Sequence, residues 1–397
     1  MPGTTALTAP VVPLPLDAPP GLYVHVPFCR HICPYCDFNT YAGQETIIPD
    51  YVEAVLTEMR MTSDLSPSDG APSLFFGGGT PSLLSPEQVG SIVALARDRF
   101  GLREDAEVTL ESNPESLDVA YLAALRQAGV NRLSIGIQSQ QRAGLRVLGR
   151  GHTAEKAEHA LEAAREAGFD NVSLDFIFGW PGQTLEMWRD DLETILRWQP
   201  EHVSLYSLIV EPGTPMHTAV DRGILRALDD DTVAGFYEMA VETLGGAGWE
   251  HYEIANWARK PRYRSRHNQL YWQAGGYYGF GAGAHGTLGD SRSSNLLLPA
   301  KYISVVREGK RPVAVSETLS PETAMGESMM LGLRLLVDGV SASAFAARHG
   351  VELGARYQAE IDRLVAVGML EWHTPDRIRL TERGALLAND VCAAFLA

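Results

Sequence analysis

The alternation of apolar runs with helical patterns is the feature of this 397-residue chain that most limits its possible folds. Each apolar run is continuous enough to be a strand buried on both faces, and the segments between the runs have the period of amphipathic helices. The strands are predicted at residues 22–28, 73–78, 106–112, 132–138, 171–179 and 202–210, and the helices at 50–63, 86–99, 118–128, 154–167 and 185–198. This order predicts an α/β fold in which a parallel sheet, open or curled toward a barrel, carries its helices outside.

Polar and reactive side chains fall where the predicted strands end. In α/β folds of this kind, functional groups gather at the C-terminal ends of the strands. Cys29, the 77–80 turn, Glu111, Gln138 and Asp175 all lie at or near such ends. We therefore expect them to share one rim of the sheet.

The composition divides the chain into four parts. Residues 1–20 are rich in Pro, Ala and Thr and are predicted to be disordered. The alternating region, 21–255, is predicted to be the core domain, and a Gly- and aromatic-rich connector, 256–320, follows it, in which 287–295 is expected to be a loop. Residues 321–397 predict three helices, a short strand pair and a last helix, an order similar to a winged helix. Cys392 is expected to be buried in that last helix.

The charge pattern excludes some classes of function. Lys and Arg number 33 against 49 Asp and Glu, so the net charge is −16, and no basic run alternates with aromatic residues. A nucleic-acid surface is therefore not expected. No run of about twenty apolar residues predicts a membrane span, and the N-terminus lacks the charged segment and apolar core of a secretory signal. We expect a cytoplasmic protein.

Cys29, Cys33 and Cys36 lie in one loop after the first predicted strand. In a reducing compartment such a cluster indicates metal or redox chemistry and not a disulfide. Three thiolates can bind three irons of a cubane cluster and leave the fourth iron open. The open iron can bind the amino and carboxylate groups of S-adenosylmethionine (SAM), and an electron delivered there cleaves the sulfonium to a 5′-deoxyadenosyl radical.

Two other interpretations of the cysteines remain open at this point. A zinc ion could use the three thiols with His31 or His25 as the fourth ligand in a closed structural site. Alternatively, residues 33–36 have the Cys-Pro-Tyr-Cys sequence of a glutaredoxin dithiol. Thiol exchange leaves Cys29 without a role, and the residues after Cys36 do not begin the amphipathic helix that such a motif caps. The iron–sulfur interpretation explains all three thiols.

Several motifs occur together along the chain: YVHVPFCRHICPYCDF, FFGGGTPS, LESNPE, RLSIGIQS, LGRGH, LDFIFGWPGQT, YSLIVEPGT and FGAGAHG. In this combination the chain resembles the radical-SAM superfamily and, within it, the branch that contains the oxygen-independent coproporphyrinogen III oxidases and the HemW-type haem chaperones. The resemblance extends from about Gly21 to the C-terminus. It implies a partial (β/α)6 TIM-like barrel with a C-terminal helical, winged-helix-like domain of the HemN type.

The resemblance also implies which residues form the site. Cys29, Cys33 and Cys36 would hold the [4Fe-4S] cluster. The residues implied for SAM are Tyr23, Tyr35, Gly78, Gly79, Thr80, Glu111, Gln138, Arg150, Asp175 and Ile209. Glycine is expected at two of these positions because the backbone must approach the ligand more closely than a Cβ permits.

Two departures separate this chain from the oxidases of that branch. The oxidases carry a further cysteine just beyond the cluster motif, where this chain has Phe38, and they carry a longer N-terminal segment. The sequence HNQLYW at 267–272 instead fits the HNxxYW motif of the HemW-type proteins. Haem needs an axial donor and flat aromatic surfaces, which His267, Tyr271 and Trp272 would supply.

We therefore predict a haem chaperone that binds a [4Fe-4S] cluster, SAM and one haem, and passes the haem to an acceptor protein, soluble or membrane-bound. The alternative is a radical SAM enzyme of the coproporphyrinogen oxidase type. A zinc- or thiol-based redox protein is the third interpretation.

Overall fold

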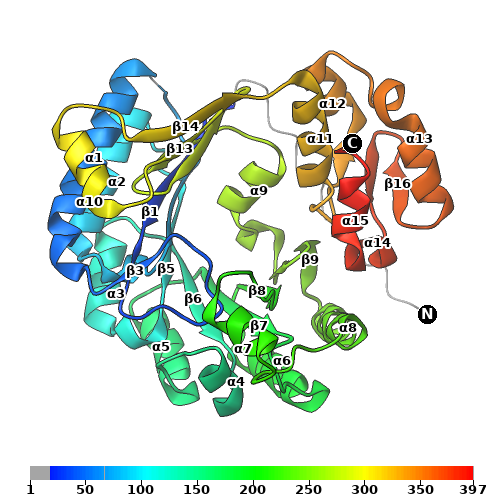
Figure 1. Cartoon of the computed structure of the whole chain (residues 1–397), viewed down its shortest axis with the longest axis horizontal. Helices are drawn as coiled ribbons and strands as arrows, with labels where there is room; N and C mark the ends of the chain where they lie inside the picture. The colour runs from blue at the N-terminus through cyan, green and yellow to red at the C-terminus, as the bar shows by residue number, and fades with distance from the viewer. Residues whose placement is uncertain (1–17, 67, 397) are drawn as a thin grey trace.

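The computed structural model describes residues 18–66 and 68–396 (Figure 1). The predicted core strands are present as β1 (Gly21–Val26), β4 (Ser73–Gly78), β5 (Glu107–Ser112), β6 (Arg132–Gln138), β7 (Val172–Phe178) and β8 (His202–Ser207). The predicted helices are α1 (Ile48–Leu65), α2 (Pro86–Phe100), α3 (Val119–Gln127), α5 (Ala154–Glu166) and α6 (Leu185–Trp198). The α/β prediction is confirmed. Most of the segment predicted to be disordered, residues 1–17, lies outside the described residues.

The core strands form one parallel sheet that continues at both ends into antiparallel strands. The order is β14-β13-β12-β11-β1-β4-β5-β6-β7-β8-β10-β9, with β11 parallel to β1 and β10 antiparallel to β8. The added strands are β9 (Glu250–Glu253), β10 (Asn256–Ala258), β11 (Tyr277–Phe280), β12 (His285–Leu288), β13 (Ser291–Asn295) and β14 (Val313–Thr318). Because β14 and β9 end the order without pairing to each other, the barrel is partial, as predicted. The core helices cover its outer face (Figure 1).

The expectation of a loop at 287–295 is wrong, because this stretch forms most of the β12–β13 hairpin. Its side chains are mostly small, polar and partly exposed, so the apolar signal of a strand is missing. The further helices of this region are α4 (Arg142–Val147), α7 (Pro215–Asp221), α8 (Asp230–Gly246), α9 (Arg266–Trp272) and α10 (Pro299–Arg307). Across the described part of the chain, no helix is both long and apolar enough to cross a membrane.

Local sequence signals set the helix boundaries. The Ser85 side chain caps α2 by accepting a backbone N–H, Pro86 takes its first position, and Gly101 ends it at a φ of +56°. Gly129 and Gly168, which follow α3 and α5, have φ values of +105° and +85°. Local sequence signals therefore determine where the chain leaves these helices and returns to the sheet.

Two large, separate hydrophobic cores lie in the described part of the chain. The larger one fills the space between the sheet and its helices and includes Phe176 and Trp188. The C-terminal domain has its own core around Met329 and Tyr357. Its elements are α11 (Pro321–Gly332), β15 (Val340–Ser341), α12 (Ala342–His349), α13 (Leu353–Ala366), β16 (Leu370–Thr374), β17 (Arg377–Leu380), α14 (Glu382–Leu386) and α15 (Ala388–Ala393). The helical, winged-helix-like prediction is confirmed, and Cys392 is buried in α15 as expected.

A buried ion-pair network joins the C-terminal domain to the barrel. The Arg264 side chain is only 2% exposed. Its guanidinium donates to Glu250 at 2.7 and 2.8 Å and to Asp338 at 3.0 Å. Glu250 begins β9, whereas Asp338 follows α11, so the arginine connects the two domains.

Replacing Arg264 with alanine is expected to lower the free energy of unfolding by about 3–5 kcal/mol, because it removes the cation from buried carboxylates. Urea denaturation followed by circular dichroism measures the change. Arg103→Ala is the control: it breaks a pair with Asp105 whose side chains are 53% and 69% exposed, and it should cost less than about 1 kcal/mol. Equal losses in the two variants would show that the network does not stabilise the junction.

Candidate functional site

The three predicted cluster ligands lie on a loop that is closed at its base. Cys29 ends the short strand β2 (Phe28–Cys29), which pairs with β3 (Tyr41–Ala42), so the chain returns beside its starting point. Within the loop, the Cys36 amide donates to the Cys33 carbonyl at 3.1 Å. The loop lies over the ends of the parallel strands (Figure 1).

The cysteine loop rests on the segment after α4. His31 Nε2 donates to the Gly149 carbonyl at 3.2 Å. Gly149 has a φ of +65°, and a Cβ there would lie 2.4 Å from the Pro34 ring. The Pro34 carbonyl accepts from the Met216 amide at 2.9 Å. These contacts fix the loop between the LGRGH segment and the start of α7.

A cavity of about 460 Å³ opens between the cysteine loop and the strand ends. All the residues predicted for SAM except Tyr23 line it, together with the three cysteines. Those residues are Cys29, Cys33, Cys36, Tyr35, Gly78, Gly79, Thr80, Glu111, Gln138, Arg150, Asp175 and Ile209. The structure therefore brings them together on one rim, and their roles as ligands stay predictions.

Tyr23, on β1, does not itself line the cavity. Its hydroxyl is 2.9 Å from Nδ1 of His25, and Nε2 of His25 is 3.0 Å from the Asn39 carbonyl at the end of the cysteine loop. His25 is buried, and the sequence suggested it only as a zinc ligand. The contacts instead give it a positioning role, because it connects β1 to the loop.

The glycine turn after β4 approaches the cysteine loop through backbone alone. Gly78 has a φ of +113°, and a Cβ there would lie 2.6 Å from the His25 ring. A Cβ on Gly79 would lie 2.7 Å from the Phe28 carbonyl oxygen and 3.0 Å from Cys29 Sγ. A larger residue cannot occupy either position without displacement, so the backbone itself forms this wall of the cavity.

Two carboxyl groups form the floor of the cavity. Glu111 accepts from the Gly78 amide at 3.1 Å, and Asp175 accepts from the Ser134 hydroxyl at 2.9 Å. Burial and the neighbouring Asp175 raise the pKa of Glu111 to about 8, and burial raises the pKa of Asp175. Two enclosed carboxylates repel each other, so a cationic ligand between the loop and this floor would stabilise their charged forms. A sulfonium with an amino group, such as SAM, has this character.

Arg150 connects the end of β6 to the cysteine loop. Its Nη2 donates to Asn113 Oδ1 at 2.5 Å and to the Gly136 carbonyl at 3.0 Å, while Nη1 lies 3.6 Å from Cys33 Sγ. Its Nε is buried and has no partner among the residues that the structure describes. A buried, unpartnered N–H beside a polar cavity fits a bound polar ligand.

The cavity also contains residues that the sequence did not single out. Asn113, Ser134 and Tyr206 line it alongside the predicted residues. Asn113 belongs to the LESNPE motif and Ser134 to RLSIGIQS. Both motifs indicated the site, but they did not indicate that these particular residues line the cavity. Gln138 has a φ of +67° at a bulge in β6, a strained conformation for a residue other than glycine and one that is common at functional sites.

Three thiols that line one cavity suit a cluster held by three cysteines. Zinc requires four ligands at roughly 2.0–2.3 Å from one point. Across residues 18–66 and 68–396, no three His, Cys, Asp or Glu side chains are gathered in a way that could hold one metal ion. In a cubane each cysteine binds a different iron, so the three sulfurs need not meet at one point. The Thr80 hydroxyl, 3.5 Å from Cys29 Sγ, is placed to stabilise a thiolate ligand.

The motif predicted for haem is divided between two environments. His267 is 1% exposed, with Nδ1 2.8 Å from the Ser73 hydroxyl and Nε2 2.6 Å from the Tyr271 hydroxyl. Burial lowers the pKa of His267 to about 3, so the ring is neutral. Trp272 packs on the C-terminal domain, where the Arg334 guanidinium lies 4.5 Å from its ring centre. Binding of haem iron by His267 would require Tyr271 to move away, and the assignment stays a prediction.

The fold and the site define a radical SAM protein. The model of the Radical SAM superfamily matches residues 23–195, and that of the HemN C-terminal domain matches residues 319–387. The structure is similar to that of coproporphyrinogen III oxidase (HemN) from Escherichia coli, with a TM-score of 0.81 over 95% of this chain and 90% of that one. At 22% identity, this likeness shows the fold.

More specifically, the chain belongs to the HemW family. It is 37% identical to the heme chaperone HemW of Bacillus subtilis, over 94% of this chain and 98% of that protein. It is also 37% identical to the heme chaperone HemW of Mycobacterium tuberculosis, over 97% of each. The mitochondrial radical S-adenosyl methionine domain-containing protein 1 of Mus musculus is 38% identical, over 83% of this chain and 72% of that protein.

Gly78→Ala is expected to weaken SAM binding by at least about tenfold, because the new Cβ would collide with the His25 ring and displace the turn. Gly43→Ala is the matched control, since Gly43 also has a positive φ, +71°, but nothing lies within 4 Å of its Cβ. Calorimetric titration of anaerobically reconstituted protein measures the affinity. Equal affinities in the two variants would contradict a role of the turn in binding.

SAM binding is expected to strengthen between about pH 6 and pH 9, because only ionised Glu111 attracts a cationic ligand. With a pKa raised to about 8, the unliganded group keeps its proton below that pH, and binding then loses up to about tenfold per pH unit. Glu111→Gln removes this titration. The difference in log Kd between variant and wild type, followed over pH, isolates the carboxyl group, and parallel curves would show that it does not face the charge of the ligand.

Proposed function

We propose that this chain is a haem chaperone that holds a [4Fe-4S] cluster and SAM, takes up one haem and passes it to an acceptor protein. The observation that carries the proposal is the likeness to two proteins named heme chaperone HemW over nearly the full length of the chain. The cavity supports it, because three thiols, a glycine turn and paired carboxyl groups suit a cluster with a sulfonium ligand.

In this proposal the chain's own residues position the ligands. Cys29, Cys33 and Cys36 would hold three irons of the cluster. When bound, such a cluster supplies single electrons and an open iron for SAM. Glu111 attracts the positive charge of SAM from the floor of the cavity. Arg150 supports Cys33 and offers its unpartnered Nε–H to a polar atom of the ligand.

For haem, we propose that His267 would supply a nitrogen ligand to the iron if Tyr271 released it. The imidazole is neutral because burial lowers its pKa to about 3, so it can bind iron without losing a proton. Until then its ring is stacked on Phe75, with 5.1 Å between ring centres. Haem uptake is therefore coupled to a local opening of the motif in this proposal.

We further propose a cytoplasmic location and an acceptor that is either soluble or membrane-bound. Three closely spaced free thiols favour a reducing compartment. The division into a core domain (21–255), a connector (256–320) and a C-terminal domain (321–397) remains part of the proposal, and the two separate hydrophobic cores support it.

A radical enzyme of the coproporphyrinogen oxidase type is the second candidate function. The observation in its favour is the shared fold with HemN, together with a cavity large enough for more than the cluster. Against it stands Phe38, 66% exposed at the cavity mouth, where the resemblance leads us to expect a cysteine in an oxidase. Formation of protoporphyrinogen from coproporphyrinogen by the reconstituted protein would favour the enzyme.

Anaerobically reconstituted protein is expected to hold about four irons per chain and to shift the Soret band of added haem. His267→Ala should abolish this shift, whereas Tyr271→Phe should preserve it, because that change frees Nε2 and leaves the imidazole in place. His373→Ala, at an exposed histidine of β16, is the control. A His267→Ala titration identical to that of wild type, with only thermal stability lowered, would give His267 a structural role instead.

A further inference from the structure

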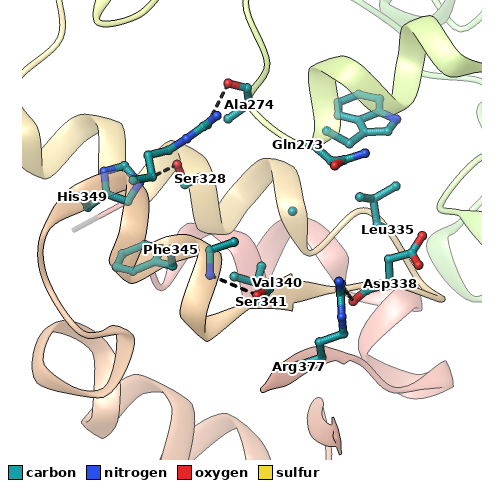
Figure 2. A pocket seen from close by; sticks show the side chains of 15 residues that line it. Gln273, Ala274, Ser328, Leu335, Asp338, Val340, Ser341, Phe345, His349 and Arg377 are labelled. Carbon is teal, nitrogen blue, oxygen red and sulfur yellow. Dashed lines mark hydrogen bonds between the residues drawn. The ribbon is translucent and has the colours of Figure 1, made fainter. Parts of the chain in front are cut away.

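A second cavity lies at the junction between α9 and the C-terminal domain (Figure 2). It has a volume of about 90 Å³ and shares no lining residue with the cavity at the cysteine loop. Residues 272–274 form one wall, and α11, α12 and β17 contribute the others. Figure 2 shows Phe345 and His349 at one side of it and Leu335 at the other. Apolar walls and basic groups therefore meet in one small space, together with one carboxylate, Asp338, which is already paired with Arg264.

Arg348 is a partly buried cation at this cavity without a carboxylate partner. Its Nη1 donates to the Ala274 carbonyl at 2.7 Å, a contact drawn in Figure 2. Across residues 18–66 and 68–396, no carboxylate oxygen lies within 4.0 Å of its nitrogens. Burial lowers the pKa of Arg348. A desolvated guanidinium without a counter-ion is costly, so a bound anion would stabilise it.

Trp272 provides a second, independent donor at the same cavity. Its indole Nε1–H is buried and has no hydrogen-bond partner in the described part of the chain. Arg334 covers the ring from the C-terminal domain, with 4.5 Å between the guanidinium carbon and the ring centre. An acceptor atom of a ligand would satisfy this N–H.

We infer that the junction cavity is a carboxylate subsite that holds the propionate edge of haem, with Arg348 and Trp272 as its donors. The inference rests on the proposed function, because that function supplies a flat, apolar ligand with two carboxylates. An arginine suits this role because its planar fork of N–H groups matches a carboxylate with two parallel hydrogen bonds. The subsite does not include the residue that binds the haem iron. That residue is not assigned by this inference.

The volume of the cavity indicates an edge and not a whole macrocycle. With about 90 Å³ against about 460 Å³ for the cavity at the cysteine loop, it suits one edge of haem and not the whole molecule. The rest of the macrocycle would stay outside, against apolar walls such as Phe345 and Leu335. A cargo held by one edge leaves its opposite edge open to an acceptor protein, which suits transfer.

Arg348→Gln is expected to raise the dissociation constant for haemin by at least about tenfold in the reconstituted full-length protein, because a charged hydrogen bond is lost. Haemin dimethyl ester has no free carboxylates, so it should bind wild type and R348Q with equal affinity. Arg348→Lys keeps the charge without the fork and should give an intermediate value. Arg363→Gln, at an exposed arginine of α13, is the matched control and should bind haemin as wild type does.

The outcomes separate this inference from the proposed function. Equal haemin affinity in wild type and R348Q, with equal thermal melting, would overturn the carboxylate subsite and leave the chaperone proposal intact. A loss in R348Q that is as large for the dimethyl ester would also overturn it, because the arginine would then not act through carboxylates. A wild-type protein that takes up no haemin would overturn the proposed function, and the subsite with it.

Discussion

The close backbone contact between the glycine turn and the cysteine loop is the constraint on which the site depends. The Gly79 amide donates to the Val26 carbonyl at 2.8 Å, and the Thr80 amide donates to the Phe28 carbonyl at 2.8 Å. The turn is thereby hydrogen-bonded to the strand that leads into the loop, and the missing Cβ of Gly79 lets Cys29 Sγ lie against it. Because β1 and β4 are parallel neighbours, one turn of backbone positions both a predicted cluster ligand, Cys29, and a wall of the cavity predicted to hold SAM.

The charged and ionisable groups around this contact do not balance one another without bound ligands. Burial raises the pKa values of Glu111 and Asp175 on the floor of the cavity, and it also raises the pKa of the Cys29 thiol. Arg150 is a cation that contacts the loop at Cys33, and its Nε has no partner in the described residues. A floor of acids, a ring of thiols and one incompletely paired guanidinium suit a ligand with both positive and negative groups, as SAM has.

The sequence predicted the parts of the fold in which one local signal decides the outcome. β4 and β6 have the predicted bounds because continuous apolar runs are unambiguous when both faces are buried. The β12–β13 hairpin lacks that signal, since its residues are mostly small and polar. Glu111 and Asp175 could be placed on the rim by topology alone. The role of His25 could not, because it depends on contacts with residues distant in the sequence, such as Asn39.

The HNxxYW motif also shows that sequence alone does not reveal which side chains contact each other. Its spacing predicts three side chains that bind haem, but only the helical conformation of α9 shows which of them contact each other. His267 and Tyr271 are four residues apart and contact each other on one face, whereas Trp272 projects about 140° further around the helix. The sequence therefore could not show that the histidine faces the barrel and the tryptophan the C-terminal domain.

That division makes α9 the element that joins the two regions predicted to bind ligands. At its start, Glu107 of β5 accepts the amides of Arg266 and His267 at 3.0 and 3.1 Å. At its end, Trp272 lies against Arg334, which pairs with Glu253 at 3.3 Å. α9 therefore links the surroundings of His267 in the barrel to those of Trp272 at the junction cavity. The motif is thus better understood as a joint between two domains than as a set of three equivalent contacts with haem.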